Sequence, residues 1–462
     1  MAKDGQGLEV SNADGGAIAA LDFLTAEWLA FGDRLPEFIA AAEKEERCAL
    51  LPLLSANLLL TVNSTAAFAM AQCHFARAKA MAHEATARER AWLAATEAWF
   101  AGARDRAQKI HEDMASEWPH DLLAAKVGQL HAIDRGDAEG ILRIGERILP
   151  ANRDNHYVWA MAAFGLEECN RLDEAEAQAR HAIEMERHDP WAHHVVAHCL
   201  EARGRLLEGV TFLQSMADTW GRCNSFMYTH NWWHLALFLI DLDRRDEALA
   251  LFDKRVWGMQ KDFSEDQINA VSLLARLELR CVDVGERWSD VATHLEPRLH
   301  EHFSPFLDLQ YLLGLARAGR QSAVTEMLAS LEDRAERATA GEREAWADCA
   351  VPAAHGLAAY AKGDFGEAAG LLGRAMPHLR AIGGSIAQRG LFGAIHLDAL
   401  MKSGWNDAAL AILQADDRER PTVPWTKRAL SDLYRRVGRS EQALLAEYQA
   451  EQLARRYAQG QA

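Results

Sequence analysis

The segment "DRRDEALALFDKR", residues 243–255, contains a polar turn, an acidic residue, a small residue and then an amphipathic run. The same order occurs in "NRLDEAEAQARHAI" (170–183) and in "GRLLEGVTFLQSM" (204–216). The small residues of successive copies lie 34 and 39 positions apart. A repeat of this period predicts a chain built from stacked supersecondary units.

Further copies are "KGDFGEAAGLLGRAM" (362–376), "SGWNDAALAIL" (403–413) and "VGRSEQALLAEY" (437–448). A small residue allows two helices to approach closely, and the Gly or Asn before it makes the turn. Apolar residues elsewhere recur at helical spacing. This is the tetratricopeptide pattern, so we expect an all-α, right-handed superhelical solenoid of helix–turn–helix repeats.

The repeat pattern also sets the expected domain organisation. Residues 1–16 hold four glycines and are interpreted as a flexible leader. Residues 17–462 are predicted to form a single solenoid. Trp159 and Trp232 lie 16 positions before a small residue, where the motif has its first-helix tryptophan, so both are expected in the core between helices.

Composition excludes several classes of function. The chain has 462 residues, 49% of them hydrophobic, and a formal net charge of −17. An acidic protein repels the phosphate backbone, so we expect no nucleic-acid partner. The sequence has no signal peptide pattern and no apolar run of about 20 residues, so we expect no membrane partner. Seven scattered cysteines without a CxxC pair are typical of reduced thiols in the cytoplasm.

Two helical segments are unusually rich in histidine: "PWAHHVVAHCLE" (190–201) and "THNWWHLALF" (229–238). In a tetratricopeptide unit, the first helix lines the concave surface, and positions at a helical period share one face. Five polar residues are therefore expected to point into one groove: His194, His198, Glu201, His230 and His234. His193 and Cys199 fall towards the helix packing and are interpreted as structural.

The spacing of these histidines would allow several imidazoles to act on the same bound atom. Histidines at i and i+4 stand about 5–6 Å apart at Cβ, and packed helices lie about 8–10 Å apart, so imidazoles of both helices could reach a common atom. Three other interpretations stay open: a groove that binds peptides, histidines buried for packing, and chance. If the site is functional, its histidines and Glu201 are the candidate catalytic residues.

The sequence does not decide whether a metal takes part. Histidine and carboxylate at i, i+3 and i+4 form a ligand set for zinc or iron. Metal-free acid–base chemistry fits equally well, because histidine titrates near neutral pH. From the sequence we expect no resident metal. The sequence identifies no cofactor.

Two other segments have both a chemical and a structural interpretation. Cys223 precedes the "THNWWH" helix and could be a nucleophile, but a small buried turn residue is the favoured interpretation. In "AIGGSIAQRG" (381–390), Ser385 can cap a helix whose first turn carries Gln388 and Arg389. The segment is either an ordinary turn or an anion site in which Arg389 holds a carboxylate.

The motifs "DPWAHHVVAHCLE", "HNWWHLAL", "SLLARLEL" followed by "VGERWSDV", and "GGSIAQR" together resemble the tetratricopeptide repeat protein 38 family over residues 100–440. The resemblance implies a helical-repeat fold with a polar cavity and no particular reaction. The positions that match the family are His194, His198, Glu201, His230, Asn231, Trp233, His234, Arg276, Asp308, Gly383, Gly384, Ser385, Gln388 and Arg389.

The chain departs from the family pattern at three positions. Asn269 stands where the pattern has an aspartate, Gln310 where it has a histidine, and Gly390 where it has an aspartate. The resemblance thus implies that two acids and one histidine are missing from the cavity. Their loss would change a substrate or remove a step, and would lower the capacity for metal.

The leading hypothesis is a cytoplasmic solenoid that encloses a small polar ligand, an anion held by Arg389, with hydrolytic or proton-transfer chemistry. Trp191 and Trp233 would wall the site, and the ligand-binding residues would be Asn231, Arg276, Asp308, Gln388 and Arg389. The alternative is a scaffold whose concave groove binds a peptide or a partner protein. The sequence leaves the oligomeric state, including a homodimer, open.

Overall fold

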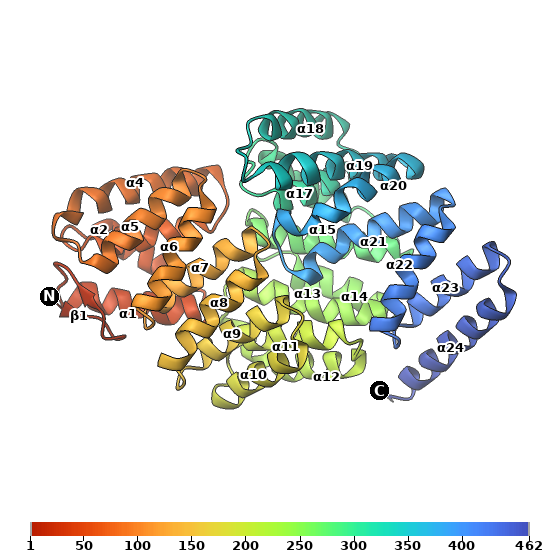
Figure 1. Cartoon of the computed structure of the whole chain (residues 1–462), viewed down its shortest axis with the longest axis horizontal. Coiled ribbons are helices and arrows are strands. Elements are labelled where there is room, and N and C mark those ends of the chain that lie inside the picture. The colour runs from red at the N-terminus through yellow and green to blue at the C-terminus, as the bar shows by residue number, and fades with distance from the viewer. Residues whose placement is uncertain (1, 461–462) are drawn as a thin grey trace. The chain divides into compact units, whose positions relative to one another are not determined.

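The computed structural model describes residues 2–460, and most of them lie in α-helices joined by short turns (Figure 1). This confirms the predicted all-α solenoid of helical repeats. The contacts of the chain group its helices into two compact units. Unit 1 comprises Met1–Val196 and Thr219–Met227, and unit 2 comprises Ala197–Asp218 and Tyr228–Ala462.

Unit 1 begins with two short antiparallel strands and continues with paired helices. Its elements are β1 (Ala2–Lys3), β2 (Glu9–Val10), α1 (Gly15–Leu29), α2 (Leu35–Lys44), α3 (Leu50–Leu60), α4 (Thr65–Met81), η1 (Ala82–Glu84), α5 (Ala87–Phe100), α6 (Arg104–Glu117), α7 (Leu122–Asp134), α8 (Ala138–Ile148), η2 (Leu149–Ala151), α9 (His156–Glu168) and α10 (Leu172–Met185). Three elements cross the unit boundaries: α11 (Pro190–Ala202), η3 (Ala217–Arg222) and α13 (Ser225–Asp241).

Unit 2 repeats the helical hairpin to the end of the described residues. Its further elements are α12 (Leu206–Met216), α14 (Arg245–Leu251), η4 (Phe252–Val256), α15 (Ser264–Leu279), α16 (Arg287–Leu295), η5 (Glu296–Arg298), α17 (Pro305–Arg317), α18 (Gln321–Glu336), η6 (Glu344–Ala350), α19 (Val351–Lys362), α20 (Phe365–Ala375), η7 (Met376–Ile382), α21 (Ile386–Ser403), α22 (Asn406–Glu419), α23 (Pro424–Arg436) and α24 (Ser440–Ala458).

The turn inside each quoted repeat has a residue in the left-handed region. Asn170 (φ 59°), Gly204 (φ 65°) and Asp243 (φ 65°) each stand between two helices. Gly, Asn and Asp tolerate this backbone conformation best, which explains why the repeat pattern has such a residue there. The predicted hairpin turns are therefore confirmed.

The small residues of the repeat lie where two helices approach. Ala175 and Ala248 have no exposed surface. A Cβ on Gly209 of α12 would stand 2.3 Å from a ring carbon of Phe238 on α13. The small residue thus admits a large side chain from the following repeat, which is how the apolar faces of consecutive hairpins interdigitate.

Residues 2–16, interpreted from the sequence as a flexible leader, contain two paired strands and the start of a helix. Strands β1 and β2 pair, and Val10 is fully buried. The backbone N–H of Ser11 donates to Glu89 Oε1 (3.0 Å), and the Asp14 carboxylate caps α1. Gly5 and Gly7 lie in the turn between the two strands, and Gly15 and Gly16 begin α1. The buried Val10 holds the hairpin against the rest of unit 1.

The tryptophans expected in the core are only partly buried. Trp159 packs edge-on against His181 of α10 (ring centroids 4.7 Å apart), and its Nε1 donates to Arg153 O. Trp232 contacts Tyr228 and the guanidinium of Arg255. Both lie against neighbouring side chains at the edge of a helix pair, and Trp159 packs against the buried cluster of Ala160, Ala182 and Ala192 between helices.

Unit 2 closes upon itself. Thr422 Oγ1, between α22 and α23, donates to Gly204 O in the α11–α12 turn (2.6 Å). Arg420 pairs with Asp241 at the end of α13 (3.1 Å). Segments about 200 positions apart therefore touch, and the α11–α12 hairpin and the end of α13 contact the segment between α22 and α23.

In the part of the chain that the structure describes, no helix combines the length and the apolar character needed to cross a membrane.

Candidate functional site: a buried cluster of histidines

Helices α11 and α13 each carry two histidines one turn apart. Asp189 fixes the start of α11, because its carboxylate accepts from the backbone N–H groups of Trp191 and Ala192 (3.1 and 3.0 Å). Asn224 Oδ1 accepts from Met227 N at the start of α13 (3.0 Å). These caps set the register that turns the four histidines, all at most 2% exposed, towards the same side of their helices: His194, His198, His230 and His234.

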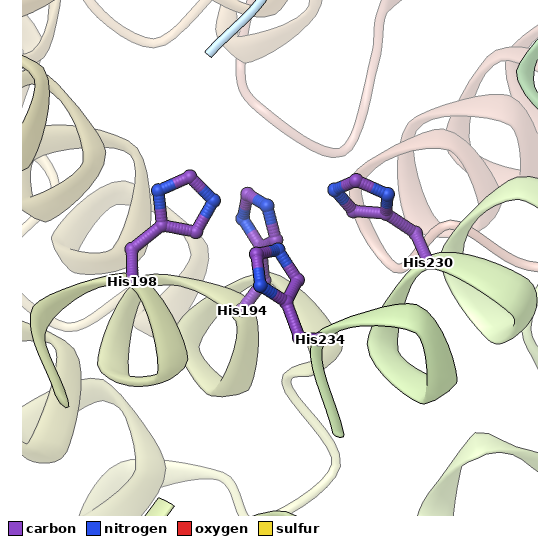
Figure 2. Close-up of side chains that lie close together, drawn as sticks. All are labelled: His194, His198, His230 and His234. Atoms are coloured by element: carbon purple, nitrogen blue, oxygen red, sulfur yellow. The ribbon is translucent and has the colours of Figure 1, made fainter. Parts of the chain in front are cut away.

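The three histidines of unit 2 converge. The rings of His198 and His234 lie 4.7 Å apart between centroids, and those of His230 and His234 lie 4.8 Å apart. One nitrogen of each ring lies within 4.8 Å of the others. Figure 2 shows these rings pointing towards one another, with His194 drawn one turn before His198 on the same helix. We call His198, His230 and His234 the histidine cluster.

Asn269 of α15 orients one member of the cluster. His230 Nδ1–H donates to Asn269 Oδ1 (2.9 Å), so Nε2 is the unprotonated nitrogen of the neutral ring. Asn269 Nδ2 donates to Thr229 Oγ1 (3.1 Å), which donates to Asp266 Oδ1 (3.2 Å). Burial lowers the pKa of His230 to about 3, which keeps its ring neutral at neutral pH.

Glu201 stands beside another member of the cluster. Its Oε2 lies 3.5 Å from Nδ1 of His234, and it comes from the same helix as His198. Burial raises the pKa of the Glu201 carboxyl, while the positive charges of Arg276 and Arg420 oppose that rise. The predicted pairing of Glu201 with the histidines across two helices is consistent with this contact.

Trp233 and Arg276 form one wall of the cluster. Trp233 is fully buried and stacks on His230 at 5.1 Å with a 9° tilt. The guanidinium of Arg276 lies 5.8 Å from the Trp233 ring, and its Nη2 donates to Ala387 O at the start of α21 (2.7 Å). Burial lowers the pKa of Arg276 to about 10, so the group stays positively charged at neutral pH.

Gln388 and Arg389 satisfy the backbone of their own helix start. Gln388 Oε1 accepts from Ser385 N (2.9 Å), and Ser385 Oγ accepts from Gln388 N (3.3 Å), which completes a capping box. Arg389 Nη1 donates to the carbonyl oxygens of Gly384 and Gly383. The anion site expected at this helix start remains a prediction.

Asp308 belongs to a different set of contacts. It is buried, and its Oδ2 accepts from Nδ1 of His302 (2.6 Å). Nε2 of His302 lies 2.7 Å from Ser330 Oγ. Burial raises the pKa of Asp308. His302 was not among the residues predicted from the sequence, because it lies outside the repeat pattern. Gln310 is buried on the same helix as Asp308.

Trp191 packs within unit 1. It stacks on His194 at 4.4 Å and on Phe31 at 5.2 Å. The ammonium group of Lys126 lies 3.4 Å from the centroid of Phe31, and burial lowers the pKa of Lys126 to about 7. Trp191 is therefore part of an aromatic stack with His194 and Phe31. Asn231, another predicted ligand-binding residue, is fully buried on α13.

The structural interpretations of His193 and Cys223 fit the structure. Trp220 Nε1 donates to Nδ1 of the buried His193 (3.2 Å). Burial raises the pKa of the Cys223 thiol to about 12, so a thiolate nucleophile is disfavoured at neutral pH.

A pocket of about 260 Å³ lies elsewhere in unit 2. It is lined by residues of α15, α17, α19, α20 and α21, among them Glu278, Arg317, Tyr360 and Lys402. It shares no residue with the histidine cluster. Three of its charged groups are paired, because Arg317 forms a two-bond contact with Glu278 and Lys402 pairs with Asp398, so the chemistry of the site is better sought at the cluster.

No family model matches the chain. Among solved structures, human IFIT1 as a dimer with PPP-AAAA is similar over 91% of this chain and 95% of its own, with 14% identity and a TM-score of 0.41. The Cut9–Hcn1 hetero-tetramer of the APC/C is similar over 95% of this chain and 86% of its own, with 12% identity and a TM-score of 0.33.

Proposed function

We propose that unit 2 binds a small anionic molecule between Arg276 and the histidine cluster, and that the imidazoles exchange protons with it. The observation that carries this proposal is the position of Gly390. A Cβ at that position would lie 3.5 Å from Nη2 of Arg276. Position 390 therefore faces a charged guanidinium and supplies no carboxylate.

The resemblance to the tetratricopeptide repeat protein 38 family gives this position its meaning. We propose that the chain is a divergent relative of that family, whose pattern has an aspartate at position 390. An aspartate there would place its carboxylate beside Arg276 as an internal counter-ion. In this chain a ligand carboxylate, sulfate or phosphate would take that role, because a half-buried cation is stabilised by a paired anion.

The neighbouring groups would act on the bound molecule. Neutral imidazole nitrogens accept hydrogen bonds and protons, and a carboxyl group with a raised pKa, such as Glu201, can donate one. Together they would support hydrolytic or proton-transfer chemistry. The closure of unit 2 through Arg420 and Thr422 favours a small ligand over the alternative, an open groove for a peptide.

The proposal is tested by anion-induced shifts of the melting temperature. Millimolar sulfate, phosphate or acetate should raise the melting temperature of the wild-type protein by about 2 °C. Gly390→Asp should abolish the shift, because it supplies the anion internally, and Arg276→Met should abolish it by removing the cation. Gly393→Asp on the same helix, where a Cβ meets nothing within 4 Å, is the matched control and should keep the shift.

An equal shift in all four proteins would show that the anion binds elsewhere and would overturn the proposal. Where the shift follows the expected order, capture of metabolites by the purified protein, followed by mass spectrometry, identifies the natural anion.

A further inference from the structure

The histidine cluster presents three nitrogen donors to one point. Its members come from two helices, are at most 2% exposed, and have one nitrogen each within 4.8 Å of the others. Imidazole nitrogen is a preferred ligand of zinc and of neighbouring transition metals. We propose that His198, His230 and His234 bind one divalent transition-metal ion of the zinc class.

The surroundings orient the rings as a metal site requires. A histidine that binds metal through one nitrogen usually donates its other N–H to a carboxylate or carbonyl oxygen. His230 Nδ1 donates to Asn269 Oδ1 at 2.9 Å, and His234 Nδ1 stands 3.5 Å from Glu201 Oε2. With Nδ1 of each ring turned to these oxygens, Nε2 would be the donor to the ion in both histidines.

A second pair of buried histidines in the chain shows a different arrangement. His111 and His131 of unit 1 stack with centroids 5.6 Å apart, and each ring packs edge-on against a tryptophan, Trp92 or Trp99. No third imidazole completes that pair among the histidine groups found in residues 2–460. This pair serves packing, so it supplies an internal control for a metal-binding test.

The replacement of an aspartate by Asn269 is compatible with metal. The sequence alone suggested a lower metal capacity, because a carboxylate of the family pattern is absent at this position. In the structure, Asn269 contacts His230 through an oxygen and does not need to be a ligand itself. This inference deepens the proposed function and rests on the same site: an ion held by three imidazoles keeps coordination positions for water or for the proposed anion.

The first test measures metal directly. The purified protein is stripped with a chelator, dialysed against micromolar Zn²⁺ or Co²⁺ and analysed for bound metal. One ion per chain, with the visible absorption of Co²⁺ in a nitrogen-ligand site, is the expected result. A folded protein that retains less than about a tenth of an equivalent overturns the inference.

Substitutions then locate the ion. His230→Gln and His234→Gln should weaken Co²⁺ binding by about 100-fold, whereas His111→Gln should leave it unchanged. Asn269→Asp keeps all three rings and should tighten binding by about 10-fold, because a carboxylate makes the imidazole a stronger donor. Circular dichroism and melting confirm folding. An unchanged Co²⁺ affinity in Asn269→Asp and in both cluster variants overturns the assignment.

The same samples separate this inference from the proposed function. Anion-induced melting shifts are measured on both the metal-free and the Zn²⁺-loaded protein. A shift that depends on Arg276, without stoichiometric metal, supports the anion site and overturns the metal site. Stoichiometric Co²⁺ without any anion shift supports the metal site and overturns the proposed function.

Discussion

Asn269 keeps the hydrogen-bond geometry that an aspartate would have at this position, but it carries no charge. An aspartate at this position would accept a hydrogen bond from His230 as Asn269 Oδ1 does. The amide also donates to Thr229, which already donates to Asp266. A carboxylate could not donate that bond, and it would lie near a second acid, so the asparagine stabilises the network but places no negative charge beside the imidazole.

The buried histidines of unit 1 predict how stability depends on pH. Burial lowers the pKa of His111 to about 4, against the slight opposing effect of Asp121, and it lowers the pKa of His131 in the same direction. An unfolded histidine has a pKa of about 6.5. The stability contributed by neutral His111 is therefore complete above about pH 6.5 and is lost as the pH falls towards 4.

The free energy of unfolding, measured in urea, should thus fall by about 2 kcal/mol from His111 alone between pH 7.5 and 5. The His111→Phe variant keeps a ring against Trp92 but cannot titrate, so it should lose less stability over that range than the wild-type protein does. Identical pH profiles for the two proteins would mean that His111 is solvated and protonated in the folded state.

At the scale of the elements, two glycines show how closely the helices approach. A Cβ on Gly165 of α9 would lie 2.5 Å from the Cα of Leu142 on α8. A Cβ on Gly209 of α12 would meet only the ring of Phe238 on α13. Backbone cannot move aside without shifting a whole helix, whereas a ring can change its rotamer, so the two positions differ in tolerance.

Gly165→Ala should therefore destabilise the fold by about 3 kcal/mol, and Gly209→Ala by about 1–2 kcal/mol. Adding Phe238→Leu to Gly209→Ala should recover part of the loss, because it removes the atoms that clash. Urea unfolding of the three variants measures the order. Equal losses at Gly165 and Gly209 would contradict the distinction between backbone and side-chain neighbours.

The sequence predicted the features that repeat. The turn at Asn170 and the small residue Ala175 recur with the period of the hairpin, so pattern alone located them. The convergence of the cluster followed from i, i+4 spacing on adjacent helices. Asn269 lies 39 positions after His230, about one repeat later, so the same period could have indicated this partner.

Other contacts could not be predicted from the local sequence pattern. His302 reaches Asp308 from an irregular segment outside the repeat pattern. Thr422 contacts Gly204 across 218 positions. Such contacts depend on the small rotation between successive hairpins, which accumulates over many repeats and is set by packing. The burial of Val10 likewise had no signal in the sequence, because glycines surround it.

At the scale of the molecule, a charge network holds unit 2 closed. Asp241 of α13 pairs with Arg420 (3.1 Å) and with Arg280 of α15 (3.4 Å). The guanidinium of Arg280 lies 3.8 Å from the Trp425 ring of α23. The nearby carboxylates raise the pKa of Arg420 and burial opposes them, so the group is charged throughout the physiological range. One network thus joins the early hairpins of unit 2 to its last helices.

Arg420→Met tests whether this network closes the unit. Asp241 would keep Arg280 but lose its nearer partner, and both groups retain some exposure, so we expect a loss of about 2 kcal/mol, below the 3–5 kcal/mol typical of a fully buried pair. Cleavage between α22 and α23 in limited proteolysis should accelerate in parallel, because the Thr422–Gly204 contact lies beside the pair. The control is Arg435→Met. Arg435 and its partner Glu447 are both exposed (46% and 47%), so this variant should lose less than about 0.5 kcal/mol of stability. If the two variants unfold at the same urea concentration and are cleaved at the same rate, apolar packing alone holds unit 2 closed and the ion pairs do not contribute.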